Sequence, residues 1–274
     1  MSRRLVVDPG PFTWRFGVVD DDGLAALRVV DLVAGVEGDV FRAQVTAHAR
    51  ELGGVFADIG RTAPVFVRLS AARRRQPPDE GAALLVQGVA DAIGDKGARA
   101  TTRVTLAGAY LAMRSDDDGP IVGDGVPPAV GARLRDRAHA LFADRAVELG
   151  AAADGVDDAT LSAEASALSG LMTAVRARFE AATAPGPLLT SDERLGLAAR
   201  ALAAHVDAVL TTEPARLRLR RLVRPLGLDD AVTGTAEPWA AAGAPDAIAE
   251  LDAAATPFGD GAALVVEPTA ACVA

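Results

Sequence analysis

The sequence predicts an α+β protein that carries a small β-barrel between two parts of a larger fold. Three observations support this fold class. Residues 38 to 113 contain short runs of β-branched and aromatic residues separated by glycines, which is typical of an all-β barrel or sandwich. Residues 129 to 148 and residues 160 to 182 each place apolar side chains at helical spacing, and Asp157 or Asp158 is the expected cap of the second helix. Residues 185 to 224 alternate strand and helix signals, beginning with a strand near Leu188, and residues 246 to 251 and 263 to 267 predict a further helix and strand.

The first 33 residues predict three strands. The turn Asp20-Asp21-Asp22-Gly23 predicts a hairpin between the second and third of them. Asp8 ends the first apolar run and has two interpretations. It either caps the Pro9-Gly10 turn or binds a metal ion at the end of its strand, and we favour the cap.

The predicted barrel contains residues suited to single-stranded nucleic acid. OB-type barrels stack bases on aromatic rings and hold phosphates in a cationic groove. The candidate rings are Phe56 and Phe66, although a phenylalanine in such a strand is also a common core residue. The candidate cations are Lys96, Arg99 and Arg103.

The charge distribution favours this barrel as the binding region. The whole chain has a net charge of −9, which argues against general nucleic-acid affinity. Residues 38 to 114, however, hold eleven Lys and Arg against seven Asp and Glu. Lys96 is the single lysine of the chain. Residues 70 to 82 are expected to form a loop, in which Arg73-Arg74-Arg75 either helps to attract phosphates or is simply solvated.

Composition limits the other possibilities. A single cysteine, Cys272, excludes an internal disulfide framework, and we expect a cytoplasmic setting. No apolar run reaches the length of a membrane span, so no membrane association is expected. The three histidines show no metal-ligand spacing.

Two segments of the barrel region carry a family resemblance. The first is Phe56-Ala57-Asp58-Ile59-Gly60, followed by Phe66. The second is Asp95-Lys96-Gly97-Ala98, then Thr101-Thr102, then Leu106-Ala107-Gly108-Ala109-Tyr110-Leu111. Both resemble the RNA-binding module, of the ribosomal S-one type, in bacterial ribonuclease E/G enzymes. The resemblance implies that Phe56, Phe66 and Lys96 contact RNA.

The resemblance also implies a domain organisation. It predicts a ribonuclease-H-like sheet that is interrupted by the OB-type barrel and by a helical, sensor-like region. The expected segments are 1–37 and 185–245 for the two parts of the sheet, 38–113 for the barrel, 114–184 for the sensor-like region and 246–274 for the start of a catalytic subdomain.

The implied activity is endoribonucleolytic processing and decay of single-stranded RNA. In the family a magnesium site hydrolyses the backbone. In register with this sequence, the first of its aspartates would lie just beyond Ala274 and the second further downstream. We therefore expect a C-terminally truncated member whose 274 residues are inactive alone, and a homo-oligomer in the full-length protein. The alternatives are a non-catalytic RNA-binding protein and an unrelated scaffold whose barrel contacts protein.

The sensor-like region departs from the family pattern. The family holds the 5′-monophosphate end of RNA with an Arg-Thr pair, which falls here on Glu148 and Leu149. A carboxylate repels phosphate, and a leucine offers no hydrogen-bond donor. We therefore predict no 5′-phosphate recognition by the usual groups.

Overall fold

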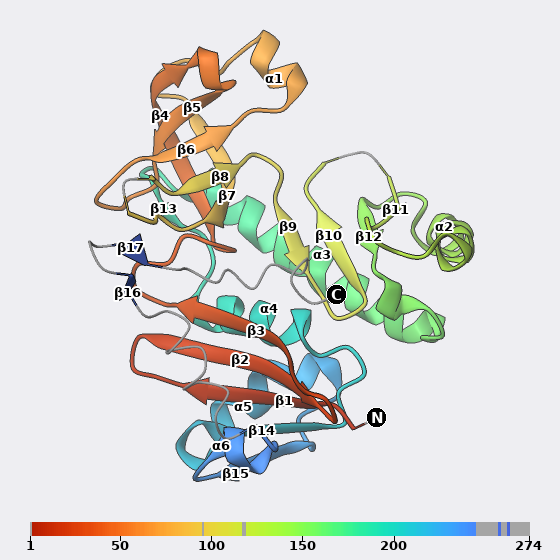
Figure 1. Cartoon of the computed structure of the whole chain (residues 1–274). Coiled ribbons are helices and arrows are strands. Elements are labelled where there is room, and N and C mark those ends of the chain that lie inside the picture. The colour runs from red at the N-terminus through yellow and green to blue at the C-terminus, as the bar shows by residue number, and fades with distance from the viewer. Residues whose placement is uncertain (1, 95, 117–118, 245–256, 259–261, 264–274) are drawn as a thin grey trace. The chain divides into compact units, whose positions relative to one another are not determined.

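The computed structural model describes residues 2–94, 96–116, 119–244, 257–258 and 262–263 (Figure 1). The chain divides into two compact units. We call Met1–Val33 with Ala198–Ala274 the sheet unit, and Ala34–Leu197 the barrel unit. Among the described residues, no helix has both the length and the apolar character needed to cross a membrane.

The sheet unit is built on a mixed five-stranded sheet in the order β15-β14-β1-β2-β3. The three N-terminal strands are antiparallel neighbours, whereas β14 and β15 run parallel to β1. The central strand β1 buries Leu5, Val6 and Val7 completely, as expected for a strand covered on both faces. The strands are β1 (Arg4–Pro9), β2 (Thr13–Asp20), β3 (Gly23–Asp31), β14 (Ala208–Thr212) and β15 (Val232–Thr235).

The hairpin predicted at residues 20 to 23 joins β2 to β3, with Asp20 opposite Gly23. Asp8 does not cap the Pro9-Gly10 turn. It lies within β1, accepts a hydrogen bond from Trp239 Nε1 at 3.3 Å and pairs with Arg15 at 3.7 Å. The indole of Trp239 in turn packs against Val6 and Val19, so Asp8 orients a core residue.

After residue 185, two described α-helices lie where the sequence alternates strand and helix signals, and a third, at residues 238 to 241, was not predicted. α4 (Ser191–Ala201) has its acids in the first turn, where they favour the helix dipole. α5 (Arg216–Val223) lies between two short 3-10 turns, η3 (Glu213–Ala215) and η4 (Arg224–Leu226). α6 (Pro238–Ala241) carries the buried Trp239.

The barrel unit contains a closed five-stranded barrel, as the sequence predicts. Its order is β4-β5-β6-β8-β7, and β7 closes on β4. Only the β6–β8 pair is parallel. This connectivity, in which the fifth strand sits between the third and the fourth, is compatible with an OB-type barrel (Figure 1). The strands are β4 (Val40–Ala49), β5 (Gly54–Asp58), β6 (Val65–Arg68), β7 (Ala83–Ala90) and β8 (Arg99–Thr101).

Two short elements close one part of the barrel. The 3-10 turn η1 (Arg50–Leu52) joins β4 to β5. The helix α1 (Ala71–Arg75) lies in the β6–β7 connection, where the sequence predicts a loop. The loop prediction is wrong here because Ser70 caps a helical turn: its Oγ accepts from Arg73 N at 3.4 Å, and its carbonyl accepts from Arg74 N at 2.9 Å.

Alternation along the strands separates the barrel core from its outer face. In β6, Val65 and Val67 are buried while Phe66 and Arg68 lie outside. The core consists of small and branched residues from all five strands, with Phe41 the one aromatic member. Phe56 and Phe66 are not in this core, so the interpretation of these rings as core residues is wrong, and their contact with RNA stays a prediction.

The rest of the barrel unit is a small sheet covered by two helices. Its order is β11-β12-β10-β9, and α3 and α2 pack on it around Leu111, Leu149 and Leu168. The predicted cap of α3 is confirmed, because Asp157 Oδ1 accepts from Thr160 N at 2.8 Å. The elements are β9 (Thr105–Ala107), β10 (Leu111–Arg114), β11 (Ile121–Val122), α2 (Pro128–Phe142), β12 (Val147–Leu149), η2 (Ala151–Ala153), α3 (Asp158–Ala181) and β13 (Gly186–Pro187).

The helix predicted over residues 129 to 148 ends earlier, at Phe142, because Val147–Leu149 pairs with β10 as a strand. The strand expected near Leu188 is the two-residue β13, which pairs with the outside of β4. The described end of the chain holds only the short pair β16 (Pro257–Phe258) and β17 (Ala262–Ala263). The helix expected at 246 to 251 and most of the strand expected at 263 to 267 lie outside the described residues.

Candidate nucleic-acid interface

Three of the five predicted RNA-contacting residues form one row across the outside of the barrel. Phe56 in β5 lies opposite Phe66 in β6, and Phe66 lies opposite Arg99 in β8. The two rings meet edge to face, with centroids 5.9 Å apart and planes at 66°. Phe56 is 38% exposed and Arg99 is exposed, while Phe66 is partly covered. The row therefore presents two rings and a cation to solvent.

A glycine makes room for the second ring. A Cβ atom at Gly54 would lie 2.5 Å from two carbons of the Phe66 ring and 2.5 Å from the Val67 carbonyl oxygen. The Phe66 ring therefore lies over the backbone of β5 at Gly54, two residues before Phe56. The sequence feature behind this packing is the Gly53-Gly54 pair, which alone would be taken as a turn signal.

A turn after β5 fixes the strand that carries Phe56. Asp58 Oδ1 accepts from Gly60 N at 2.7 Å, and Gly60 adopts a positive φ of 73°. A Cβ at Gly60 would also lie 2.7 Å from the Pro185 carbonyl oxygen. The aromatic-x-Asp-x-Gly pattern is thus a local turn in which aspartate and glycine have structural roles.

Polar side chains that the sequence analysis did not single out surround the row. Arg68 is exposed on β6, opposite Gly54 and Thr101. Thr46 is exposed on β4, and its hydroxyl donates to the Phe56 carbonyl oxygen at 3.2 Å. The in-out alternation of Val65-Phe66-Val67-Arg68 is the signal that would have identified Arg68.

Lys96 lies outside the strands. It is exposed in the β7–β8 connection, three residues before Arg99, and its backbone exchanges hydrogen bonds with Ile93, each at 3.0 Å. This connection therefore holds Lys96 in a defined turn at the entrance to β8. The single lysine therefore lies in the connection that leads directly into β8, the strand that carries Arg99.

Arg103 does not belong to the row. It follows β8, and its guanidinium pairs with Asp116 at 2.8 Å. Asp116 also lies 3.4 Å from Arg114, whose side chain is buried. Arg103 is thus part of a charge cluster beside the small sheet, in which it shares Asp116 with Arg114.

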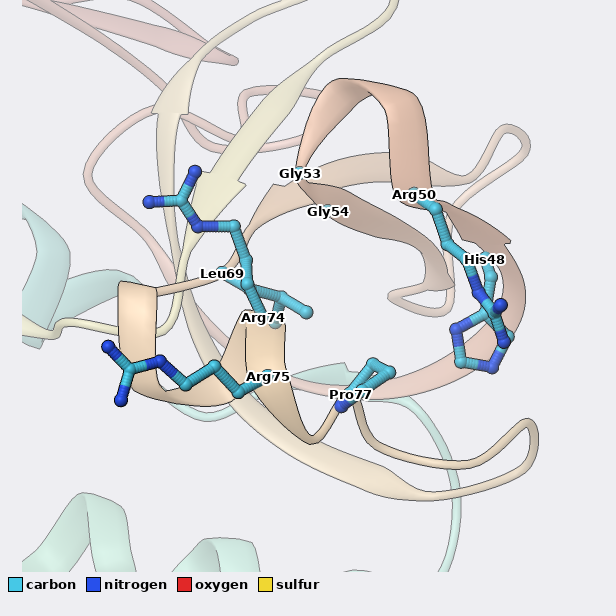
Figure 2. Close-up of a pocket in the computed structure, with 8 residues that line it drawn as sticks. All are labelled: His48, Arg50, Gly53, Gly54, Leu69, Arg74, Arg75 and Pro77. Carbon is cyan, nitrogen blue, oxygen red and sulfur yellow. The ribbon is translucent and has the colours of Figure 1, made fainter.

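A cationic pocket adjoins the row at Gly54. It has a volume of about 340 Å³. His48 and Arg50 line it from the β4–β5 side, and Arg74 and Arg75 come from α1 (Figure 2). Gly53, Gly54, Leu69 and Pro77 complete the lining, which contains no acidic residue. Because Gly54 also supports the Phe66 ring, the pocket and the aromatic row share one backbone segment.

No protein-family model and no curated protein matches this sequence. The likeness to ribonuclease E/G therefore rests on the two motif segments alone.

The second motif segment has a structural explanation of its own. The buried carboxylate of Glu164, on α3, accepts three backbone hydrogen bonds, from Ala109 N at 2.6 Å, Tyr110 N at 3.0 Å and Leu111 N at 3.1 Å. A Cβ at Gly108 would lie 2.5 Å from this carboxylate. The Leu-Ala-Gly-x-Tyr-Leu pattern thus forms a turn that wraps around one buried acid. Its residues fasten β9 and β10 to α3.

The positions expected for 5′-phosphate recognition lie in β12. Leu149 is fully buried in the core of the small sheet. Glu148 points near Gly123, whose Cβ position lies 3.0 Å from a Glu148 carboxylate oxygen. Neither side chain is a phosphate ligand by its chemistry, and the predicted lack of 5′-end recognition stays a prediction.

The expected magnesium has no fitting site among the residues that the structure describes. Magnesium is held by carboxylates that converge on one point. No cluster of three or more His, Cys, Asp or Glu side chains in the described ranges could hold a metal ion. We therefore derive no catalytic step through magnesium from these residues.

A buried acid directly precedes the first strand of the barrel. Asp39 is 1% exposed and precedes β4. Its burial raises the pKa of its carboxyl to about 6, although Arg194 at 3.4 Å, the Val40 amide and Arg61 all favour the charged form. Among the described residues, Asp39 Oδ2 accepts no hydrogen bond.

Proposed function

We propose that the barrel binds single-stranded RNA, with Phe56, Phe66 and Arg99 as the central contacts and Lys96 at their edge. The observation that carries the proposal is the outward pair of rings. A phenylalanine exposed on a strand loses the benefit of core burial, and two such rings side by side give a stacking surface for bases. Arg99 supplies the positive charge that phosphates require.

The choice of RNA over other ligands rests on the motif resemblance. The two segments that resemble ribonuclease E/G enclose the row, from Phe56 to the β8 entrance. The positive balance of residues 38 to 114 on an acidic chain supports an anionic ligand at this surface. A barrel that contacts protein is the alternative, since aromatic rings and arginines are also common in protein interfaces, and RNA binding decides between the two.

Binding to a fluorescent decauridylate, followed by anisotropy, tests this proposal. Each base–ring stack contributes roughly 1–3 kcal/mol, so Phe56→Ala and Phe66→Ala should each weaken binding about 5-fold to 150-fold. Phe12→Ala is the matched control, because Phe12 is 64% exposed in the sheet unit, outside the barrel. Equal affinity of the wild type and both barrel variants would remove the RNA assignment.

We further propose that the sheet unit is ribonuclease-H-like. The antiparallel β1-β2-β3 hairpins followed by parallel β14 and β15 support it. An endoribonuclease activity of the full-length protein, with magnesium ligands outside the described residues, rests on the motif resemblance alone. Labelled RNA incubated with the full-length protein and with the 274-residue chain, with and without Mg²⁺, tests it. Absence of Mg²⁺-dependent cleavage by the full-length protein would remove the activity, and cleavage by the 274-residue chain would contradict our expectation that this chain is inactive alone.

A further inference from the structure

The pocket beside the aromatic row is built for an anion. Four of its eight lining residues carry or can carry positive charge, and none carries negative charge. Arg50, Arg74 and Arg75 are exposed, and among the described residues none of them forms an ion pair with an acid. Elsewhere in the barrel unit, arginines such as Arg103, Arg133 and Arg178 are paired with acids. The pocket is thus lined by arginines from two sides with no acid between them, which suits an anionic ligand.

The backbone of the pocket allows close approach. Gly53 and Gly54 form its wall next to β5, and neither carries a side chain that would exclude a ligand. Gly53 has a positive φ of 69°, which glycine adopts without strain. The Arg74 side chain lies along this glycine, since a Cβ at Gly53 would be 3.1 Å from Arg74 Cδ and 3.4 Å from Nη1. The guanidinium groups of Arg74 and Arg75 lie on the opposite side of the pocket from Arg50 and His48 (Figure 2).

The position of the pocket suits an RNA strand whose bases stack on the aromatic row. Gly54 is two residues from Phe56 along β5, a rise of about 7 Å. The Phe66 ring covers Gly54 from the outer face. A base on Phe66 therefore has its sugar-phosphate backbone within reach of the pocket.

We infer that this pocket is a phosphate subsite of the RNA surface. It takes one internal phosphodiester of the strand that stacks on Phe56 and Phe66, with Arg50 and Arg74 as its cations and His48 as a further nitrogen ligand. The inference rests on the proposed RNA binding and extends it, because it fixes where the strand continues beyond the rings. The strand passes from the row toward η1 and α1, and not toward the charge cluster of Arg103 and Asp116.

The salt dependence of binding tests this inference. Each phosphate neutralised on a single strand contributes about −0.7 to the slope of log K against log salt concentration. In titrations with 5′-hydroxyl decauridylate between low and moderate salt, the double variant Arg50→Ala/Arg74→Ala should have a slope shallower by about 0.7. Arg73→Ala/Arg135→Ala is the control with the same charge change. Arg73 shares α1 but lines a different pocket, and Arg135 is exposed on α2.

The outcomes separate this inference from the RNA proposal. Phe56→Ala should weaken binding without changing the slope, because stacking releases no counterions. If the wild type binds and Phe56→Ala weakens binding, but the Arg50/Arg74 variant keeps the wild-type slope, the pocket is not a phosphate subsite. An equal slope change in the control variant would assign the effect to the general field of the barrel and overturn the inference as well.

A second arm distinguishes an internal phosphate from a terminal one. The Arg50/Arg74 variant should lose the same slope on decauridylate with a 5′-phosphate as on the 5′-hydroxyl form. A loss confined to the phosphorylated oligonucleotide would show a terminal site and overturn the internal assignment. Circular dichroism and thermal melting of each variant establish that the barrel is folded in every comparison.

Discussion

The buried carboxyl of Asp39 should make the free energy of unfolding depend on pH, and two competing effects set the sign of this dependence. Its carboxyl is 1% exposed, and removing the charge from water raises its pKa. Arg194, also buried and 3.4 Å away, stabilises the charged form. The effect of burial is larger, and the pKa of Asp39 in the folded protein is about 6, compared with 3.8 for an aspartate in the unfolded chain. Folding therefore takes up a proton between these two values.

The magnitude follows from the difference between the two pKa values. A shift of one unit corresponds to about 1.4 kcal/mol, so the difference gives about 3 kcal/mol. Because the folded protein prefers the protonated acid, this stability is fully present below pH 3.8 and is lost as the pH rises to about 6. Asp39→Asn keeps the acceptor for Val40 N, 2.8 Å away in the wild type, and does not titrate.

The assay is urea unfolding of wild type and Asp39→Asn at several pH values from 4 to 7.5. Other titrating groups are common to both proteins, so the difference in unfolding free energy isolates Asp39. The variant should gain about 3 kcal/mol relative to the wild type across this range. If the unfolding free energy of the variant instead falls relative to that of the wild type as the pH rises, the attraction of Arg194 outweighs burial and the reasoning is wrong.

Two further predictions concern the turns that support the site. Glu164→Ala leaves three backbone N–H groups without their acceptor and should destabilise the protein by roughly 3 kcal/mol in urea unfolding, whereas Glu180→Ala, exposed on the same helix, should have little effect. Gly54→Ala places a methyl group against the Phe66 ring and the Val67 carbonyl and should cost roughly 1–3 kcal/mol and weaken RNA binding. Gly170→Ala in α3 has open space at its Cβ and should be neutral or stabilising, and a cost as large as that of Gly54→Ala would contradict the steric argument.

The sequence predicted the elements of the barrel well because their signals are local. Alternating apolar residues identify a strand, and Asp157 before an apolar helical run identifies a cap. The α+β class and the closed barrel are confirmed. The helix α1 was missed because Arg73-Arg74-Arg75 followed by prolines is a polar segment whose helical turn depends on the Ser70 cap.

The site was predictable only in part, because sequence gives the side chains but not their neighbours. Phe56, Phe66 and Arg99 were found by chemistry, but their alignment depends on strand register and on the parallel β6–β8 pair. Arg103 was a reasonable cation from sequence, and only its tertiary partner Asp116 removes it from the row. His48 and Arg50 carry no motif, and their relevance comes from the fold that brings η1 to α1.

The two motif segments now have different meanings for function. Gly108 to Leu111 surround the carboxylate of Glu164, so this part of the second segment is explained by packing of β9 and β10 on α3 and requires no ligand. Asp58 and Gly60 are likewise explained by their turn. What packing does not explain is Phe56, which lies 38% exposed beside a ring that needs a glycine beneath it. Exposure alone does not distinguish this ring, because Phe12 in the sheet unit is 64% exposed. What distinguishes Phe56 is its place beside a second outward ring and Arg99, close to arginines that form no ion pair among the described residues. The proposed RNA site rests on this combination, along a line from Arg99 to Arg74.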